Sequence, residues 1–221
     1  MTTRRPAQFS RRKWLMSLSA AGALLSIQKQ SWAGDQVEEP LSDAVRTALS
    51  ASVAEQGPPK PVFVDTQAYL GYLRWLEQMS WRLRSKKPDQ LVRTDFLQTV
   101  WYESRRAGLS TPLVLGLIQV ESNFRKYAVS SAGARGYMQV MPFWVRLIGN
   151  GDTSVLFRLQ PNLRFGCVIL RHYLDQERGN LFMALGRYNG SRGLAAYPDA
   201  VLGAARRWEF NDAAPVRVAL P

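Results

Sequence analysis

Apolar residues recur at spacings of three and four along most of the chain after residue 64, which is the period of an amphipathic α-helix. A shorter pattern of the same kind covers residues 43–53. No run of alternating polar and apolar residues indicates a β-sheet, and no internal repeat is found. The pattern predicts helices over residues 43–53, 65–83, 89–107, 112–121, 142–148, 161–175, 181–187 and 198–210. We therefore expect a mainly α protein.

The helix expected over residues 89–107 has a signal at each end. Asp89 can cap its N-terminus, and Gly108 fits its C-terminal stop. Val92, Phe96 and Val100 are expected on its inner face.

Glu121 ends the most apolar of these helices. It follows Leu113 and Leu117 at intervals of four, so it is expected on the same buried stripe. Burial disfavours the charged carboxylate, and the negative end of the helix dipole disfavours it again, so both raise its pKa. An acid that is still protonated near neutral pH suits general-acid catalysis. The alternative is an exposed glutamate at an ordinary helix end.

A glycine-punctuated loop follows Glu121 directly. Gly133 and Gly136 allow a positive φ or a close approach of the backbone to a ligand. Ser130 offers a hydroxyl group, and Gln139 offers an amide. Apolar surface for a sugar face is offered by Tyr137, Met138 and Trp144. The loop therefore favours a pocket wall over a simple connection.

This stretch, residues 121–142, resembles the catalytic segment of the soluble lytic transglycosylase (SLT) family. The matching residues are Glu121, Ser122, Phe124, Ser130, Gly133, Ala134, Gly136, Met138, Gln139, Met141 and Pro142. Tyr137 departs from the family, which usually carries Leu there. A second run resembles the family's A-Y-N-A-G motif through Tyr188 and Asn189, with departures at Arg187, Gly190 and Ser191. The resemblance covers roughly residues 90–195.

The resemblance implies a lysozyme-like helical domain with a glycan cleft. It implies a peptidoglycan lytic transglycosylase, which cleaves the β-1,4 bond between N-acetylmuramic acid and N-acetylglucosamine without water. Glu121 would be the catalytic acid and then the base, and the product would end in 1,6-anhydro-N-acetylmuramic acid. No cofactor and no metal would be required.

The resemblance also implies the substrate-binding residues. Ser130 and Gln139 would hydrogen-bond the sugar, and Met138 would pack against its ring. Tyr188 would stand near Glu121, and Asn189 belongs to the second motif, which contributes to the glycan cleft.

Two alternatives stay open at this point. A hydrolytic enzyme like lysozyme or chitinase would use a second carboxylate, and the next acids after Glu121 are Asp152 and Asp175. A catalytically inactive glycan-binding or assembly module could share the same fold.

Composition narrows the class of partner. The chain has 221 residues, a formal net charge of +12, one cysteine and one histidine. A basic protein favours an anionic partner, but no zinc spacing or RNA-binding signature supports a nucleic acid. We expect peptidoglycan strands as the partner, with cell-envelope machinery as a further candidate, and a monomer. Cys167 and His172 are expected to be structural, and they exclude a Cys/His metal cluster.

The ends of the chain indicate export. Residues 1–33 combine a basic start, an uncharged apolar stretch over residues 14–27 and a small-x-small site, as in a cleaved signal peptide of the twin-arginine or general secretory route. The expected organisation is then a partly disordered spacer over residues 34–64, the SLT domain over residues 65–212 and a tail over residues 213–221. We expect a periplasmic protein without a stable membrane anchor.

Overall fold

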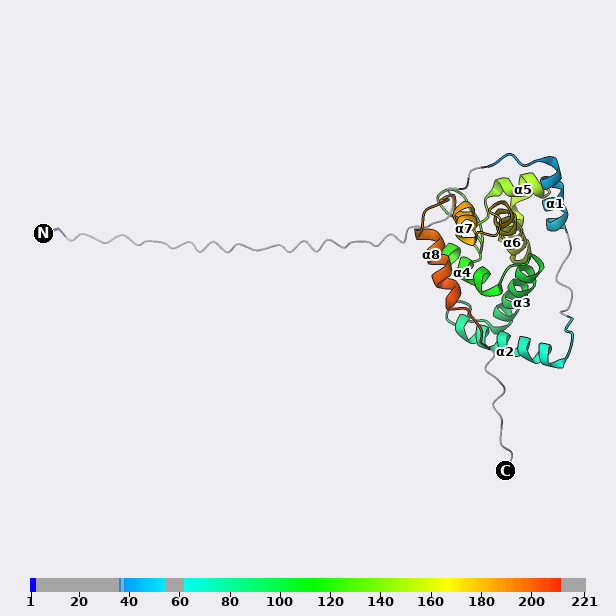
Figure 1. The fold of residues 1–221 in the computed structure, drawn as a ribbon. Coiled ribbons are helices and arrows are strands. Elements are labelled where there is room, and N and C mark those ends of the chain that lie inside the picture. The colour runs from blue at the N-terminus through cyan, green and yellow to red at the C-terminus, as the bar shows by residue number, and fades with distance from the viewer. Residues whose placement is uncertain (3–35, 37, 55–61, 212–221) are drawn as a thin grey trace, which may run out of the picture. The chain divides into compact units, whose positions relative to one another are not determined.

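The computed structural model describes residues 1–2, 36, 38–54 and 62–211. The signal peptide expected over residues 1–33, apart from its first two residues, and the tail expected over residues 213–221 lie outside the described residues. The fold below is that of the described residues within Ser31–Pro221. Its helices are α1 (Asp43–Ala54), α2 (Thr66–Leu83), α3 (Gln90–Arg106), α4 (Thr111–Ser122), α5 (Pro142–Ile148), the 3₁₀ helix η1 (Thr153–Phe157), α6 (Leu159–Gln176), α7 (Leu181–Asn189) and α8 (Ala196–Arg206) (Figure 1).

The mainly α class expected from the sequence is confirmed. Within the described residues, β-structure is limited to isolated bridges from Arg135 to Val129 and to Val140. Both bridges lie in the loop between α4 and α5, so the glycine-rich stretch is the one place where extended segments pair.

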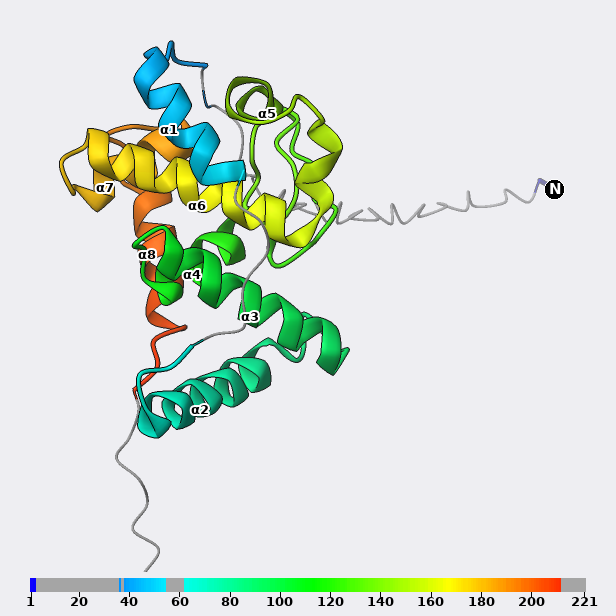
Figure 2. The ribbon, with the colours of Figure 1, turned by 90° about the vertical axis from the view of Figure 1, so that its right-hand side faces the viewer.

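Helix α4 lies in the core of the unit, with α8 alongside it (Figures 1 and 2). Ser110 caps α4 through a hydrogen bond from the amide of Leu113 at 3.4 Å. A Cβ placed on Gly116 would lie 2.5 Å from the backbone nitrogen of Ala205, so only glycine allows α8 to approach this closely. This close packing holds the later part of α8 against the middle of α4.

Of the helices, α6 and α8 have the bounds that differ most from the sequence prediction. Helix α6 begins at Leu159, two positions before Pro161, because a proline is tolerated in the first turn of a helix. Helix α8 covers Ala196–Arg206 instead of residues 198–210. The chain after α8 is held by Arg82, which donates to the carbonyls of Arg207 at 2.9 Å and of Glu209 at 2.8 Å. These tertiary hydrogen bonds replace the last helical turn.

The inner face of α3 is turned away from the predicted one at its start. Phe96 is fully buried, but Val92 is 53% exposed. The buried residues of α3, which include Leu97 and Ser104, all lie in its later turns. Asp89 caps the helix as predicted, accepting from the amide of Val92 at 2.9 Å.

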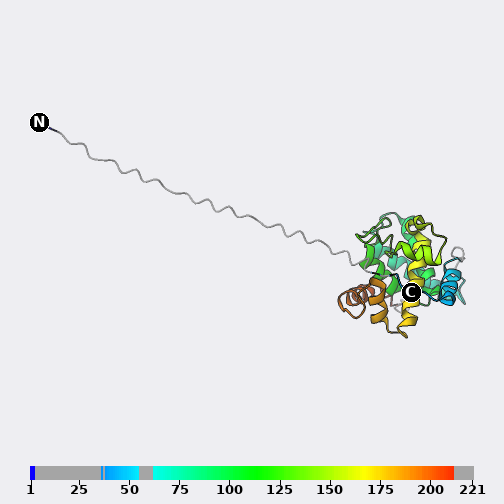
Figure 3. The same cartoon turned by 90° about the horizontal axis from the view of Figure 1, so that it is seen from above.

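The segment expected to be a spacer contains a packed helix. Helix α1 contacts α5 and α6, with Leu49 buried and Val45 and Val53 partly buried against the core. These are the three residues that the spacing places on one face. Figure 3 shows α1 at the side of the unit opposite α8. The part of residues 34–64 that forms α1 is thus docked on the domain.

Candidate active site

Glu121 occupies the last turn of α4, where only 8% of its surface is exposed. The helix ends one residue later, and Asn123 and Phe124 both adopt positive φ, at 49° and 65°. Ser122 donates to the carbonyl of Tyr137 at 2.7 Å and so ties the helix end to the following loop. The predicted burial of Glu121 is confirmed, and the alternative of an exposed carboxylate is wrong.

Burial raises the pKa of Glu121 to about 8, because desolvation penalises its charged form. A hydrogen bond from the Tyr197 hydroxyl acts in the opposite direction and lowers it. The carboxyl group is therefore mostly protonated at neutral pH, as a general acid must be.

Tyr197 is the residue that the sequence analysis missed. It lies in the first turn of α8, is fully buried and donates its hydroxyl hydrogen to Oε1 of Glu121. The other carboxyl oxygen, Oε2, is buried and has no hydrogen-bond partner among the described residues. The sequence around Tyr197 holds no signal that separates it from a core aromatic residue, because its partner lies 76 positions away.

Tyr188 lies close enough to Glu121 for the charge of that carboxylate to contribute to the raised pKa of Tyr188, behind burial as the main cause. Its hydroxyl, however, donates to the backbone carbonyl of Met138 at 2.8 Å. The hydroxyl of Tyr188 is therefore committed to the glycine-punctuated loop, and the hydrogen bond to Glu121 comes from Tyr197 instead.

The polar side chains of the loop hold its own backbone. Gln139 is 4% exposed and donates to the carbonyls of Ala128 at 3.1 Å and Gly136 at 2.9 Å. Ser130, also buried, accepts from the amide of Ala134 at 3.1 Å. A loop with little ladder pairing needs such partners for its buried backbone groups. These hydrogen bonds differ from the expectation that both side chains are directed at the sugar.

Met138 also differs from its expected role. Its side chain is fully buried, and a Cβ on Gly166 of α6 would lie 2.4 Å from the Met138 sulfur. Met138 therefore packs against the backbone of α6, where the absence of a Cβ on Gly166 leaves room for its side chain. It does not lie on a surface open to a sugar ring. Asn162 accepts from the Met138 amide at 2.9 Å and fixes this position.

Asn189 retains hydrogen-bonding capacity. It ends α7 and is 5% exposed, and its amide group donates to the Ser191 hydroxyl at 2.9 Å. Its Oδ1 atom is buried without a partner among the described residues. Of the predicted binding residues, Asn189 therefore has an acceptor that is not used by the protein.

The other candidate acids are committed elsewhere. Asp152 is exposed and caps η1 by accepting from the Ser154 amide at 3.0 Å, and hydrogen bonds from Ser154 hold the pKa of Asp152 below its usual value. Asp175 is exposed and pairs with Arg171. Neither resembles a buried, protonated acid.

Cys167 is buried, and burial raises the pKa of its thiol. In the described part of the chain, no group of three or more His, Cys, Asp or Glu side chains is placed to hold a metal ion.

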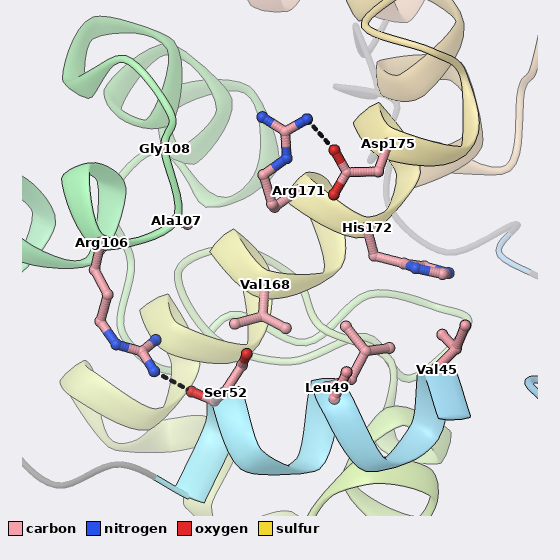
Figure 4. A pocket seen from close by; sticks show the side chains of 11 residues that line it. Val45, Leu49, Ser52, Arg106, Ala107, Gly108, Val168, Arg171, His172 and Asp175 are labelled. Carbon is pink, nitrogen blue, oxygen red and sulfur yellow. Dashed lines mark hydrogen bonds and ion pairs between the residues drawn. The ribbon is translucent and has the colours of Figure 1, made fainter. Parts of the chain in front are cut away.

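A separate cavity of about 710 Å³ lies between α1, the end of α3 and α6 (Figure 4). Its charged groups are satisfied within the chain, since Arg171 pairs with Asp175 and Arg106 donates to the Ser52 carbonyl. Val45, Leu49 and Val168 supply apolar walls. No residue of the Glu121 motif lines this cavity, so it is not the candidate active site.

The domain is mainly helical and holds a buried, mostly protonated carboxyl group beside a glycine-rich loop. Residues 99–200 match the family model described as the Transglycosylase SLT domain. The mainly helical architecture agrees with the lysozyme-like fold expected for that family.

Similar proteins carry the name "Membrane-bound lytic murein transglycosylase C". The one from Haemophilus ducreyi is 38% identical over 131 residues, which is 52% of this chain and 35% of the relative. The one from Actinobacillus pleuropneumoniae is 47% identical over 89 residues, or 37% of this chain and 24% of the relative. The one from Mannheimia succiniciproducens is 49% identical over 47 residues, which is 21% of this chain and 13% of the relative. The chain thus spans about a third or less of the length of these relatives.

Proposed function

We propose that this protein is a peptidoglycan lytic transglycosylase that cleaves the β-1,4 bond between N-acetylmuramic acid and N-acetylglucosamine. The single observation that carries the proposal is the buried carboxyl group of Glu121, with its raised pKa and one oxygen held by Tyr197. The SLT domain and the names of the similar proteins support the same activity.

Protonated Glu121 acts first as the general acid. Tyr197 orients the carboxyl group through Oε1, which leaves Oε2 to face the glycosidic oxygen. Glu121 gives its proton to that oxygen as the bond to the anomeric carbon breaks, and the leaving sugar departs with a hydroxyl group. The carboxyl group is now ionised in a desolvated site.

The ionised carboxylate acts next as the general base. It takes the proton of the muramyl 6-hydroxyl, whose oxygen attacks the anomeric carbon of the same sugar and closes the 1,6-anhydro ring. Attack within one sugar has a high effective molarity, so a positioned water and a second carboxylate are not needed. The commitments of Asp152 and Asp175 elsewhere favour this one-acid scheme over the two-carboxylate hydrolase.

The binding residues would act at two levels. Asn189, with its unused Oδ1, would contact the glycan directly. Ser130, Gln139, Met138 and Tyr188 would shape the cleft through the loop that they hold. No cofactor or metal takes part in the scheme.

The cell envelope is the proposed location, since the similar proteins are named as murein-acting and membrane-bound. We propose the periplasm, reached through the export segment over residues 1–33. No helix in the described ranges has the length and apolar character needed to cross a membrane. The absence of an anchor remains a prediction, and N-terminal sequencing of the protein from its host would test the processing.

Mass spectrometry of the fragments released from purified sacculi tests the function. The proposal expects 1,6-anhydro ends, which are lighter by one water than reducing ends. Reducing ends would establish the hydrolase instead. Binding to sacculi without fragment release would establish the inactive module.

A further inference from the structure

Lys87, in the turn between α2 and α3, is a buried cation. Among the described residues, its ammonium group contacts only neutral groups. Only 8% of its surface is exposed. Its Nζ donates to the hydroxyl of Tyr137 at 2.7 Å and lies 4.4 Å from the ring centre of Tyr137 and 4.7 Å from that of Phe96. Leaving a buried charge without an opposite charge is costly. An anion supplied from outside the chain would remove that cost.

The charged groups around Lys87 do not supply this anion. Asp89 uses its carboxylate to cap α3. The charge of Asp95 acts on Tyr137, where it contributes to the raised pKa of that residue behind burial. The charged neighbour that acts on Lys87 is a second cation, Lys126. Burial first, and then repulsion from Lys126, lower the pKa of Lys87 to about 8.

These residues adjoin the Glu121 motif. Lys126 and Tyr127 belong to the loop that leaves α4, and Tyr137 accepts the hydrogen bond from Ser122, next to Glu121. Tyr127 is 71% exposed, and the Lys126 ammonium lies 5.2 Å from its ring centre. An exposed aromatic ring beside Lys126, whose charge in turn acts on Lys87, offers a surface for a sugar face with an attached negative charge. Tyr137, the departure from the family pattern, supplies the hydroxyl that holds Lys87.

We propose that Lys87, Lys126 and Tyr127 form a subsite that binds a carboxylate carried by the glycan strand, with the Tyr127 ring packed against the adjoining sugar. The inference rests on the proposed function, because the carboxylates of peptidoglycan are those of its lactyl groups and acidic peptides. The subsite would select strands that still carry these groups over neutral glycans.

The test is a binding measurement in the Glu121→Gln background, so that the polymer is not consumed. Dissociation constants are measured for purified sacculi and for chitin, which presents a related sugar polymer without carboxylates. The variants are Lys87→Met, which keeps the length of the side chain, and Lys126→Gln on the surface. Lys86→Gln is the matched control, since Lys86 is an exposed lysine adjacent to Lys87.

Lys126→Gln is expected to weaken binding to sacculi by about 2- to 5-fold, as for an exposed ion pair. Lys87→Met is expected to weaken it by about 10-fold or more, because its charge is desolvated. Binding to chitin should not change in either variant, and Lys86→Gln should leave both affinities unchanged. The Lys126 effect should shrink in high salt.

Equal losses of affinity for sacculi and for chitin would overturn the subsite. They would show that Lys87 only supports the position of Tyr137. Unchanged affinities, or no binding of sacculi by the parent protein, would also overturn it. If Lys87→Met does not fold, Lys126→Gln decides alone. Turnover of sacculi by the protein with Glu121 intact is measured in parallel. If anhydro products form but binding to sacculi does not depend on the two lysines, only the subsite is contradicted. If binding depends on the lysines but no anhydro products form, only the proposed catalysis is contradicted.

Discussion

The hydroxyl group of Tyr197 donates a hydrogen bond to Oε1 of Glu121, which joins the first turn of α8 to the last turn of α4. The close contact of α8 with Gly116 of α4 makes this pairing geometrically possible. The candidate acid is therefore oriented by a helix outside the motif that contains it.

Tyr197→Phe is expected to slow turnover of sacculi by about 5- to 150-fold. The change removes a hydrogen bond to a buried oxygen, at a cost of about 1–3 kcal/mol, and we assign that loss to the transition state. Because the hydrogen bond lowers the pKa of Glu121, the alkaline limb of the rate profile should move to higher pH. Initial rates across pH measure both effects. An unchanged rate and profile would show that Tyr197 merely packs.

Tyr188→Phe is expected to act mainly on stability. It leaves the buried carbonyl of Met138 without its 2.8 Å partner, which costs about 1–3 kcal/mol in the free energy of unfolding. Turnover should fall with the order of the loop, while the alkaline limb should stay in place, in contrast to Tyr197→Phe. Melting temperature and pH profile are the measurements. Unchanged turnover in a well-folded variant would mean that this motif does not carry the family's chemistry here.

Glu121→Gln is expected to abolish cleavage while the protein still folds and binds glycan. General acid–base catalysis typically contributes about 10²–10⁴-fold, and one residue serves both steps here, so the loss should reach the top of that range. The assay is fragment release from sacculi, with pull-down on the same sacculi as the control for binding. Substantial remaining activity would mean that the acid is misassigned.

The same variant should change how stability depends on pH. The pKa of Glu121 is about 8 in the folded protein against 4.5 for the ordinary group, so below 4.5 both states are protonated and no penalty exists. As pH rises from 4.5 to 8, the unfolded state ionises first, and the folded state loses stability, by a total on the order of 5 kcal/mol. Glu121→Gln removes this loss. Denaturant unfolding should show that the free energy of unfolding of the variant, relative to the parent, is higher at pH 8 than at pH 5. An equal difference at both pH values would contradict the raised pKa.

Gly136→Ala should destabilise the loop more than Gly133→Ala. Both glycines have positive φ, at 77° and 88°, so both substitutions strain the backbone. A Cβ on Gly136 would also lie 2.3 Å from the carbonyl oxygen of Leu156, whereas Gly133 faces open space. The melting temperature of Gly136→Ala should therefore be clearly lower. Similar values for the two variants would show that the loop can move away from Leu156.

The sequence by itself determined the helices and the candidate acid, because both depend on local spacing. The period of apolar residues defined α2 to α7 within a few positions, and the burial of Glu121 followed from the stripe that it shares with Leu113 and Leu117. A capping residue such as Asp89 acts within one helical turn, so it could be predicted from the sequence directly.

Only the tertiary structure decided which side chains meet. Tyr188 and Tyr197 are both buried tyrosines at helix ends, and nothing local tells which hydroxyl reaches Glu121 and which reaches Met138. That choice depends on how α7 and α8 pack against α4. The pairing of Lys87 with Tyr137 across 50 positions depends likewise on the packing around the turn between α2 and α3. Hydrogen bonds between residues this far apart in the sequence form only in the folded core. The spacing of residues along a chain does not show how its helices pack against one another.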